Sequence, residues 1–149
     1  MDLYQLLRQD HQKVKRLFER LDETADGATK SRARLFAELK QELELHSDVE
    51  EAHFYPALQR HEETQDLVEE ALEEHEEVKK VLEELDQSDP EEESWSEQII
   101  ELQEDVENHV EEEETELFPK AQRVLEKAKA DEIAEAIAKD KARAKAKAT

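Results

Sequence analysis

Apolar residues recur along this chain at the spacing of amphipathic helices. They occur at positions 3, 7, 14, 17/18 and 21, at 35/36, 39, 43 and 49, at 67/68, 72, 78, 81/82 and 85, and at 99, 102, 106 and 110. Because an α-helix turns once every 3.6 residues, each series places its apolar side chains on one helical face. No segment alternates apolar and polar residues as a half-buried strand does. The pattern predicts four long helices and an all-α fold.

Local signals set the boundaries of these helices. They are expected from about Asp2 to Ala25, from Lys30 to Glu62, from Thr64 to Asp86, and from Ser94 onward. Asp2 with Gln5, and Ser94 with Glu97, have the spacing of a capping box. The only glycine, in Asp26-Gly27, marks the first break. Short connections between long amphipathic helices predict an antiparallel up-down-up-down four-helix bundle.

Two prolines and the C-terminal composition refine this picture. Pro56 and Pro119 should end or kink their helices, because proline lacks the backbone N–H and clashes with the preceding turn. We expect the bundle to occupy residues 1–126. Residues 127–149 form an Ala- and Lys-rich extension. Ile133 and Ile137 can dock a helical turn or two of it on the bundle, and the rest is expected to be a short basic tail.

Composition narrows the classes of function. The 149 residues suffice for one domain with a core, and they include no cysteine, so any bound metal must use His and carboxylate ligands. A net charge of −22 argues against nucleic-acid partners and anionic membranes. With no membrane span or secretion signal in the sequence, a cytoplasmic location is expected. No nucleophile triad or phosphate-binding glycine loop indicates a hydrolase or a transferase.

The chain also contains a duplicated pattern. Residues 10–22, DHQKVKRLFERLD, resemble residues 74–86, EHEEVKKVLEELD, and residues 46–56, HSDVEEAHFYP, resemble residues 109–119, HVEEEETELFP. One helix pair therefore occurs twice, and each copy carries two histidines and a glutamate at matching places. Such repetition predicts a site on a pseudo-two-fold axis.

Each predicted helix carries one histidine on its apolar stripe. These residues are His11, His46, His75 and His109. In an antiparallel bundle all four imidazoles reach about the same level, because each lies a similar number of residues from the loop it flanks. Glu50 and Glu113 each follow a histidine by four residues and so share its face. Two carboxylates can bridge two ions while two imidazoles hold each ion from outside.

One histidine on a helical stripe is usually an ordinary core residue, and one HxxxE motif in a Glu-rich chain means little. Four histidines at matched depth, with the whole set duplicated, favour a metal site instead. His and carboxylate ligands suit iron, manganese or zinc.

At these residues the chain resembles the hemerythrin-like, or HHE cation-binding, family. That family has one histidine on each of four antiparallel helices, with HxxxE on the second and fourth. Here the motifs are His11, His46 with Glu50 running to Phe54-Tyr55-Pro56, His75, and His109 with Glu113 running to Leu117-Phe118-Pro119. The resemblance covers about residues 2–125. It implies a non-haem centre of two iron ions bridged by both carboxylates and an oxo or hydroxo group.

The chain departs from the oxygen-carrying hemerythrins at two places. The carriers have a further histidine four residues after that of the third helix, where this chain has Lys79. Their last carboxylate lies five residues after its histidine, which would be Glu114 here, whereas internal symmetry favours Glu113. Two imidazoles per ion leave a more open site, which we expect to react with peroxide or nitric oxide rather than hold oxygen reversibly.

Other residues are weaker candidates. His53 lies on the face of His46 and Glu50, but its repeat partner is Glu116, so symmetry does not support it as a ligand. Residues one turn from the ligands are expected to form the dry walls of the site. These are Leu7, Leu43, Leu72, Val78, Val106 and Val110. Packing explains Tyr4, Tyr55 and Trp95 better than redox or gating roles do.

The sequence thus predicts a di-iron protein that binds or reacts with a small oxidant: oxygen, peroxide or nitric oxide. Two alternatives stay open at this point. One is iron storage or sensing without turnover, and the other is a metal-free helical interaction module with a basic tail.

Overall fold

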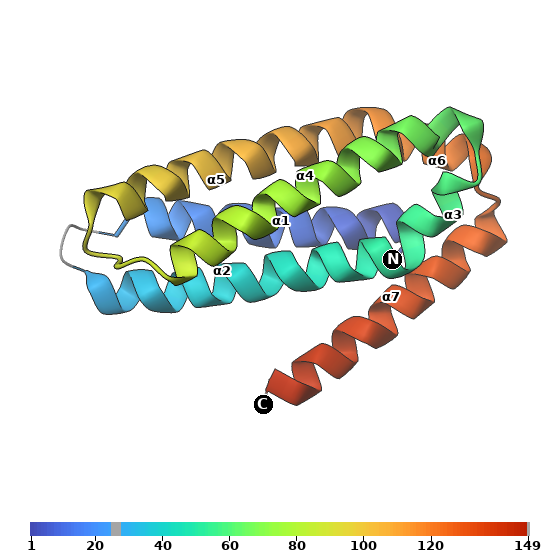
Figure 1. Ribbon diagram of the computed structural model, residues 1–149. Coiled ribbons are helices and arrows are strands. Elements are labelled where there is room, and N and C mark those ends of the chain that lie inside the picture. Colours follow the sequence, from blue (N-terminus) through green and yellow to red (C-terminus); the bar gives the residue numbers. More distant parts are fainter. Residues whose placement is uncertain (25–27, 149) are drawn as a thin grey trace.

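The computed structural model describes residues 1–24 and 28–148, and over these residues it is helical, with no strand (Figure 1). Four long helices lie side by side: α1 (Leu3–Asp22), α2 (Thr29–Val49), α4 (Glu62–Asp86) and α5 (Glu93–Glu112). Helix α1 packs against α2, and α4 packs against α5. The predicted all-α class is confirmed. No helix in the described ranges has both the length and the apolar character needed to cross a membrane.

The first helix begins as its capping signal predicts. The Gln5 backbone N–H donates to Asp2 Oδ1 at 2.8 Å, and the Asp2 N–H donates to Gln5 Oε1 at 3.0 Å. These two bonds satisfy donors that a helix start leaves free. Helix α1 ends at Asp22 rather than near Ala25. The predicted break at Asp26-Gly27 lies outside the described residues.

The second expected helix is interrupted. Helix α2 gives way to a π-helical turn, η1 (Glu50–Phe54), and then to the short α3 (Tyr55–Gln59). The same sequence of elements follows α5, with η2 (Glu113–Leu117) and α6 (Phe118–Val124). In both turns the residue before the proline donates its N–H five residues back, Tyr55 to Glu50 and Phe118 to Glu113. The helical geometry therefore changes before each proline rather than at it, and each wider turn begins at a glutamate of the duplicated motif.

The predicted capping box at Ser94 is wrong. Helix α5 begins at Glu93, with Glu92 as its N-cap, so Ser94 already lies inside the helix. The reason is the turn before it: the Asp89 side chain accepts the N–H of Glu91 at 2.9 Å, and the Asp89 carbonyl accepts that of Glu92. This turn closes before the chain reaches Ser94.

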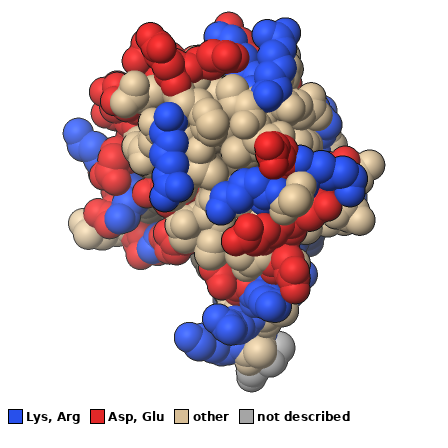
Figure 2. All heavy atoms as spheres, turned by 90° about the vertical axis from the view of Figure 1, so that its right-hand side faces the viewer, with Lys and Arg blue, Asp and Glu red and all other residues tan. Residues whose placement is uncertain are grey.

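The C-terminal extension is a helix of 22 residues, α7 (Lys127–Ala148), rather than a docked turn or two followed by a tail. Alanine and lysine are strong helix formers, which explains the length of the helix. As expected, Ile133 and Ile137 dock it, since they are only 4% and 0% exposed. Helix α7 lies against α1, α2 and η1 (Figure 1). Lys145 and Lys147 lie in its last turn, where lysine and arginine side chains project beyond the bundle (Figure 2).

Two apolar clusters fill the bundle, one at each end. The first includes Leu3, Leu7 and Phe54 together with α7, and the second includes Val14, Leu39 and Leu82. His11 lies along α1 between Leu7 of the first cluster and Val14 of the second. The clusters therefore enclose a buried polar layer halfway along the bundle.

Candidate metal centre

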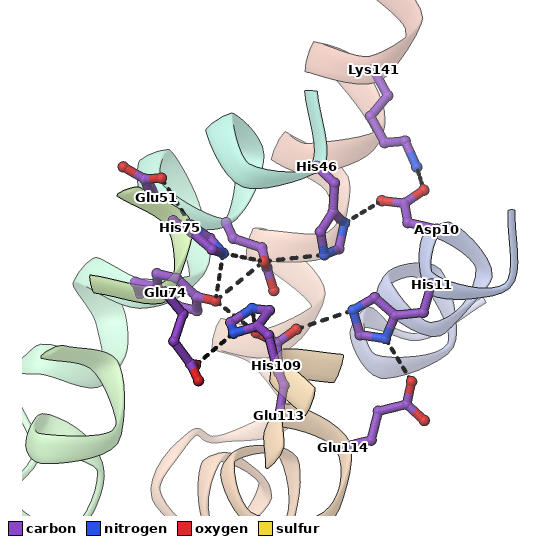
Figure 3. Close-up of polar contacts among 12 residues, drawn as sticks. Asp10, His11, His46, Glu51, Glu74, His75, His109, Glu113, Glu114 and Lys141 are labelled. Atoms are coloured by element: carbon purple, nitrogen blue, oxygen red, sulfur yellow. Dashed lines mark hydrogen bonds and ion pairs between the residues drawn. The ribbon is translucent and has the colours of Figure 1, made fainter. Parts of the chain in front are cut away.

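Six buried side chains form the polar layer between the two clusters (Figure 3). They are His11, His46, Glu50, His75, His109 and Glu113, the candidates that the sequence analysis singled out. None is more than 7% exposed, and the two glutamates are 0% and 2% exposed. Burying two carboxylates at this depth is costly unless positive charge compensates for it. The structure thus brings together all the residues predicted from the duplicated motifs.

Every imidazole points its Nε2 atom at a carboxylate. The distances are 3.3 Å from His11 to Glu113 Oε1, 3.1 Å from His46 to Glu50 Oε1, 3.3 Å from His75 to Glu50 Oε1, and 3.3 Å from His109 to Glu113 Oε2. Each glutamate therefore lies between one histidine of the α1–α2 pair and one of the α4–α5 pair. Each carboxylate thus contacts imidazoles from both helix pairs, as a bridging role would require.

The side chains form two groups that can each hold a cation. One donor atom each from His11, His46, Glu50 and Glu113 lie within 4.8 Å of one another, and so do those of Glu50, His75 and His109. Glu50 belongs to both groups. Separations of this size are close enough for one ion to gather each set at the usual distances of about 2.1 Å.

Several of the inward atoms have at most these ion-pair contacts and no hydrogen bond of good geometry among the described residues. They are the Nε2 atoms of His11, His46 and His109, Glu50 Oε2 and Glu113 Oε1. Buried polar atoms without a partner are rare in folded proteins, because leaving each one unsatisfied costs about 1–3 kcal/mol. Ligation of cations would satisfy all of them, so the residues present fit a metal centre.

A second ring of carboxylates surrounds the imidazoles. The pairs are His46 Nδ1 with Asp10 at 2.8 Å, His75 Nδ1 with Glu51 at 2.9 Å, His109 Nδ1 with Glu74 at 2.8 Å, and His11 Nδ1 with Glu114 at 2.6 Å (Figure 3). A carboxylate on the outer nitrogen fixes the ring orientation and directs the lone pair of the other nitrogen inward. All four imidazoles have such a contact, so each ring is oriented with its Nε2 atom toward the centre of the site.

The hydroxyl group of Tyr55, the first residue of α3, also reaches the centre. Tyr55 Oη donates to Glu113 Oε2 at 2.6 Å and lies 3.2 Å from Glu50 and 3.3 Å from His75 Nε2. The ring is 1% exposed. Burial and both carboxylates raise the Tyr55 pKa well above 10, so the phenol keeps its proton and acts as a hydrogen-bond donor. Packing alone, the interpretation favoured by the sequence, misses this contact.

The charges of the site support one another. Burial alone would lower the His109 pKa, but Glu113 and Glu74 raise it to about 10. Burial alone would raise the pKa of Glu113, yet its contacts with Glu50, His109 and His11 hold it well below the usual value. The glutamate is therefore ionised and the imidazole protonated at neutral pH. A cation that binds must displace that proton.

Other candidates lie outside the inner layer. Glu114 binds the outer nitrogen of His11, and its side chain is 27% exposed, so the inward carboxylate is Glu113. His53 belongs to neither group and pairs instead with Asp140 of α7 at 2.6 Å. Lys79 lines a hollow between α2 and α4 beside His75.

A small cavity adjoins the histidines on the side away from α3 and α6. Its volume is about 20 Å³, and its lining combines the four histidines with apolar residues and Ser47. Of the predicted walls, Leu43, Val78, Val106 and Val110 line it. Leu7 and Leu72 belong instead to the apolar cluster at the other side of the histidines.

The outer carboxylates were not predicted from the sequence. Their signal was present: Asp10 and Glu74 each precede a motif histidine, and Glu51 and Glu114 each follow a motif glutamate. In a chain with 43 acidic residues, however, such neighbours do not stand out. Only the fold shows which carboxylates meet an imidazole.

An all-helical fold that buries histidines and glutamates in two cation-holding groups defines a helical metal-binding protein. The model of the hemerythrin HHE cation binding domain matches residues 2–121, and the chain belongs to this family. A solved structure of a hemerythrin HHE cation binding domain-containing protein from Mycobacterium kansasii is similar to this chain, with a TM-score of 0.86 and 26% identity. The match covers 99% of this chain and 90% of that one. Among curated proteins, none matches the chain.

Proposed function

We propose that this chain is a non-haem di-iron protein that binds or reacts with a small oxidant, namely oxygen, peroxide or nitric oxide. In this proposal α1, α2, α4 and α5 form the antiparallel up-down-up-down bundle of residues 1–126. Residues 127–149 are an addition to that domain. Manganese or zinc could replace iron at the same ligands.

The observation that carries the proposal is the paired geometry of the ligands. Glu50 contributes to both His/carboxylate groups, and the imidazoles reach the layer from opposite sides. His11 and His46 would hold one ion, and His75 and His109 the other. Glu50 and Glu113 would bridge them. The unpartnered inward atoms also argue against a metal-free interaction module.

The cavity beside the four histidines is consistent with a small reactant molecule. A volume of about 20 Å³ holds little more than one water-sized molecule. Its walls include Leu43, Val78 and Val106, which exclude bulk water and larger organic molecules. The ions, when bound, supply the redox chemistry of iron toward such a molecule.

Protein groups would orient the site for that chemistry, with Tyr55 as a fixed hydrogen-bond donor. The Tyr55 hydroxyl points at both bridging carboxylates and keeps its proton at neutral pH. Asp10, Glu51, Glu74 and Glu114 would hold the imidazoles in orientation from outside.

The test begins with metal analysis of the protein purified from iron-supplied cells. We expect two irons per chain, and one in His75→Ala, whereas His61→Ala, a histidine at the start of α4 outside the site, should retain both. The absorption spectrum should change when the reduced protein meets oxygen. Peroxide decay and a nitric oxide titration then identify the reactant.

Each alternative predicts a different result. Iron uptake well above two per chain, without oxidant turnover, would indicate storage. A protein that takes up no transition metal under any of these conditions would refute the proposal.

A further inference from the structure

Helix α7 reaches the outer ring of carboxylates through one lysine. The Lys141 Nζ atom contacts Asp10 Oδ1, and the other oxygen, Asp10 Oδ2, lies 2.8 Å from His46 Nδ1 (Figure 3). His46 Nε2 in turn lies 3.1 Å from Glu50. A continuous chain of contacts therefore runs from the C-terminal helix to a bridging carboxylate.

Asp10 differs from the other three carboxylates of its ring. Its side chain is 6% exposed, whereas those of Glu51, Glu74 and Glu114 are 40%, 31% and 27% exposed. Lys141 is itself only 16% exposed, so water screens this contact weakly. Arg8 comes no closer than 3.9 Å to Glu114, and the Arg8 side chain is 45% exposed. The carboxylate of His46 is thus the one held most firmly.

We propose that Lys141 is a positioning residue of the metal centre, which acts through Asp10 on His46 and makes the ion at His11 and His46 the more tightly bound of the two. The inference rests on the proposed di-iron function. It gives a function to α7, which lies outside both the four-helix bundle and the duplicated motif.

The physical reason lies in how a carboxylate shares its two oxygens. Lys141 occupies Oδ1 and leaves Oδ2 of Asp10 for His46. With its Nδ1 proton held there, His46 presents the Nε2 lone pair inward. Without the lysine, Asp10 can rotate toward water, and His46 must be ordered when the metal binds. That ordering free energy then reduces the affinity.

The experiment measures ferrous ion binding to the full-length, metal-free protein under anaerobic conditions, in competition with a chelator of known affinity. We expect two ions in the wild type. In Lys141→Met one ion should bind about 10-fold more weakly, in the usual range for loss of an outer partner, and the other should be unchanged. Lys141→Arg should restore the affinity, and Lys139→Met, an exposed lysine on the same helix, should have no effect.

Two further variants separate positioning from loss of α7 docking. Asp140→Ala removes the contact of α7 with His53 and leaves Lys141 and Asp10 intact, so both ions should bind as in the wild type. In an Asp10→Asn background, the Lys141→Met change should have no additional effect, because Lys141 acts through Asp10.

The outcomes distinguish the two proposals. If the wild type binds no ions, the di-iron function and this inference both fail. If the wild type binds two ions and Lys141→Met binds both equally well, or if Asp140→Ala weakens one ion as much as Lys141→Met does, only the role of Lys141 is refuted.

Discussion

The two halves of the duplicated bundle offer the same ligands but have different surroundings. On the α1–α2 half, Leu6 and Val49 pack in the apolar cluster that includes Ile133 and Ile137 of α7, and Asp10 binds Lys141 of α7. The matching positions on the α4–α5 half are Glu70, Glu74 and Glu112, whose carboxylate oxygens meet within 4.8 Å at the surface. One half is covered by α7, which contributes two buried isoleucines and Lys141, and the other is open and acidic.

A second difference lies at the level of the bridging carboxylates. Tyr55 and Phe118 are equivalent in the repeat, yet only Tyr55 has a hydroxyl to donate to Glu113 and Glu50. The Phe118 ring instead stacks on that of His11, with centroids 6.1 Å apart. Duplication thus explains a symmetric donor set, while a few unmatched residues give the two His/carboxylate groups different surroundings.

Removing a carboxylate that is proposed to bridge the ions tests whether the halves depend on each other, and it should have the largest effect. Glu50→Gln should lower the metal content from two ions to one or none, because Glu50 belongs to both groups. Glu113→Gln should do the same if Glu113 bridges through its two oxygens. Metal analysis after iron loading and desalting measures both variants.

Glu116→Gln serves as the control, since this glutamate is exposed on η2 and outside both groups. If either core variant kept two tightly bound ions, the halves would not share that carboxylate.

The convergence of these histidines and glutamates was predictable because the sequence repeats them. His11 and His75, or Glu50 and Glu113, would each be ambiguous alone, but their recurrence at matched depth indicates a site. The π-helical turns after Val49 and Glu112 were not predicted, because proline signals a change of helix and not the kind of turn.

The length and the role of α7 could not be predicted from the sequence either. Only Ile133 and Ile137 give it an apolar stripe, so its composition suggested a short docked segment. The contact of Lys141 with Asp10 joins residues 131 positions apart, and no local pattern encodes such a pair. The Tyr55 hydroxyl is similar: the sequence shows the tyrosine but not that its oxygen meets both glutamates.

The response to pH tests a property that both halves share. In the metal-free protein, burial would lower the pKa values of His46 and His109, but the surrounding carboxylates raise His46 well above 6.5 and His109 to about 10. A raised pKa stabilises the fold below about pH 6.5, and this stabilisation is lost as the pH rises through the folded value. Urea denaturation of the metal-free protein should therefore show a free energy of unfolding that falls steadily as the pH rises from 6.5 toward 10.

Metal binding should show the opposite trend. The same histidines must release protons to accept an ion, so the iron affinity should rise over this pH range. His109→Gln should flatten the stability profile. A metal-free protein equally stable at pH 6.5 and pH 10 would contradict the ion pairs of the site.

The Tyr55 hydroxyl marks the difference between the halves at their centre, and Tyr55→Phe removes it. The fold should lose about 1–2 kcal/mol, because buried Glu113 loses its donor. Tyr4→Phe is a matched control, since the buried Tyr4 hydroxyl has no hydrogen-bond partner among the described residues. Urea denaturation of the metal-free variants compares them, and equal losses in both would mean that the Tyr55 contact adds nothing.

The smallest effect concerns the open acidic face. Burial together with Glu70 and Glu74 raises the pKa of Glu112 to about 7, so folding becomes less favourable as the pH rises from 4.5 through 7. Glu112→Gln removes this repulsion. Its melting temperature should exceed that of the wild type by about 1–3 °C at pH 8, a small gain because solvent screens the cluster.

At pH 4 the two proteins should have the same melting temperature, since Glu112 is then protonated in both the folded and the unfolded chain. Glu111→Gln, at an exposed neighbouring position, should show no such pH-dependent difference. If Glu112→Gln behaved like Glu111→Gln, like-charge repulsion among Glu70, Glu74 and Glu112 would not destabilise the exposed half. The two halves would then not differ in this respect.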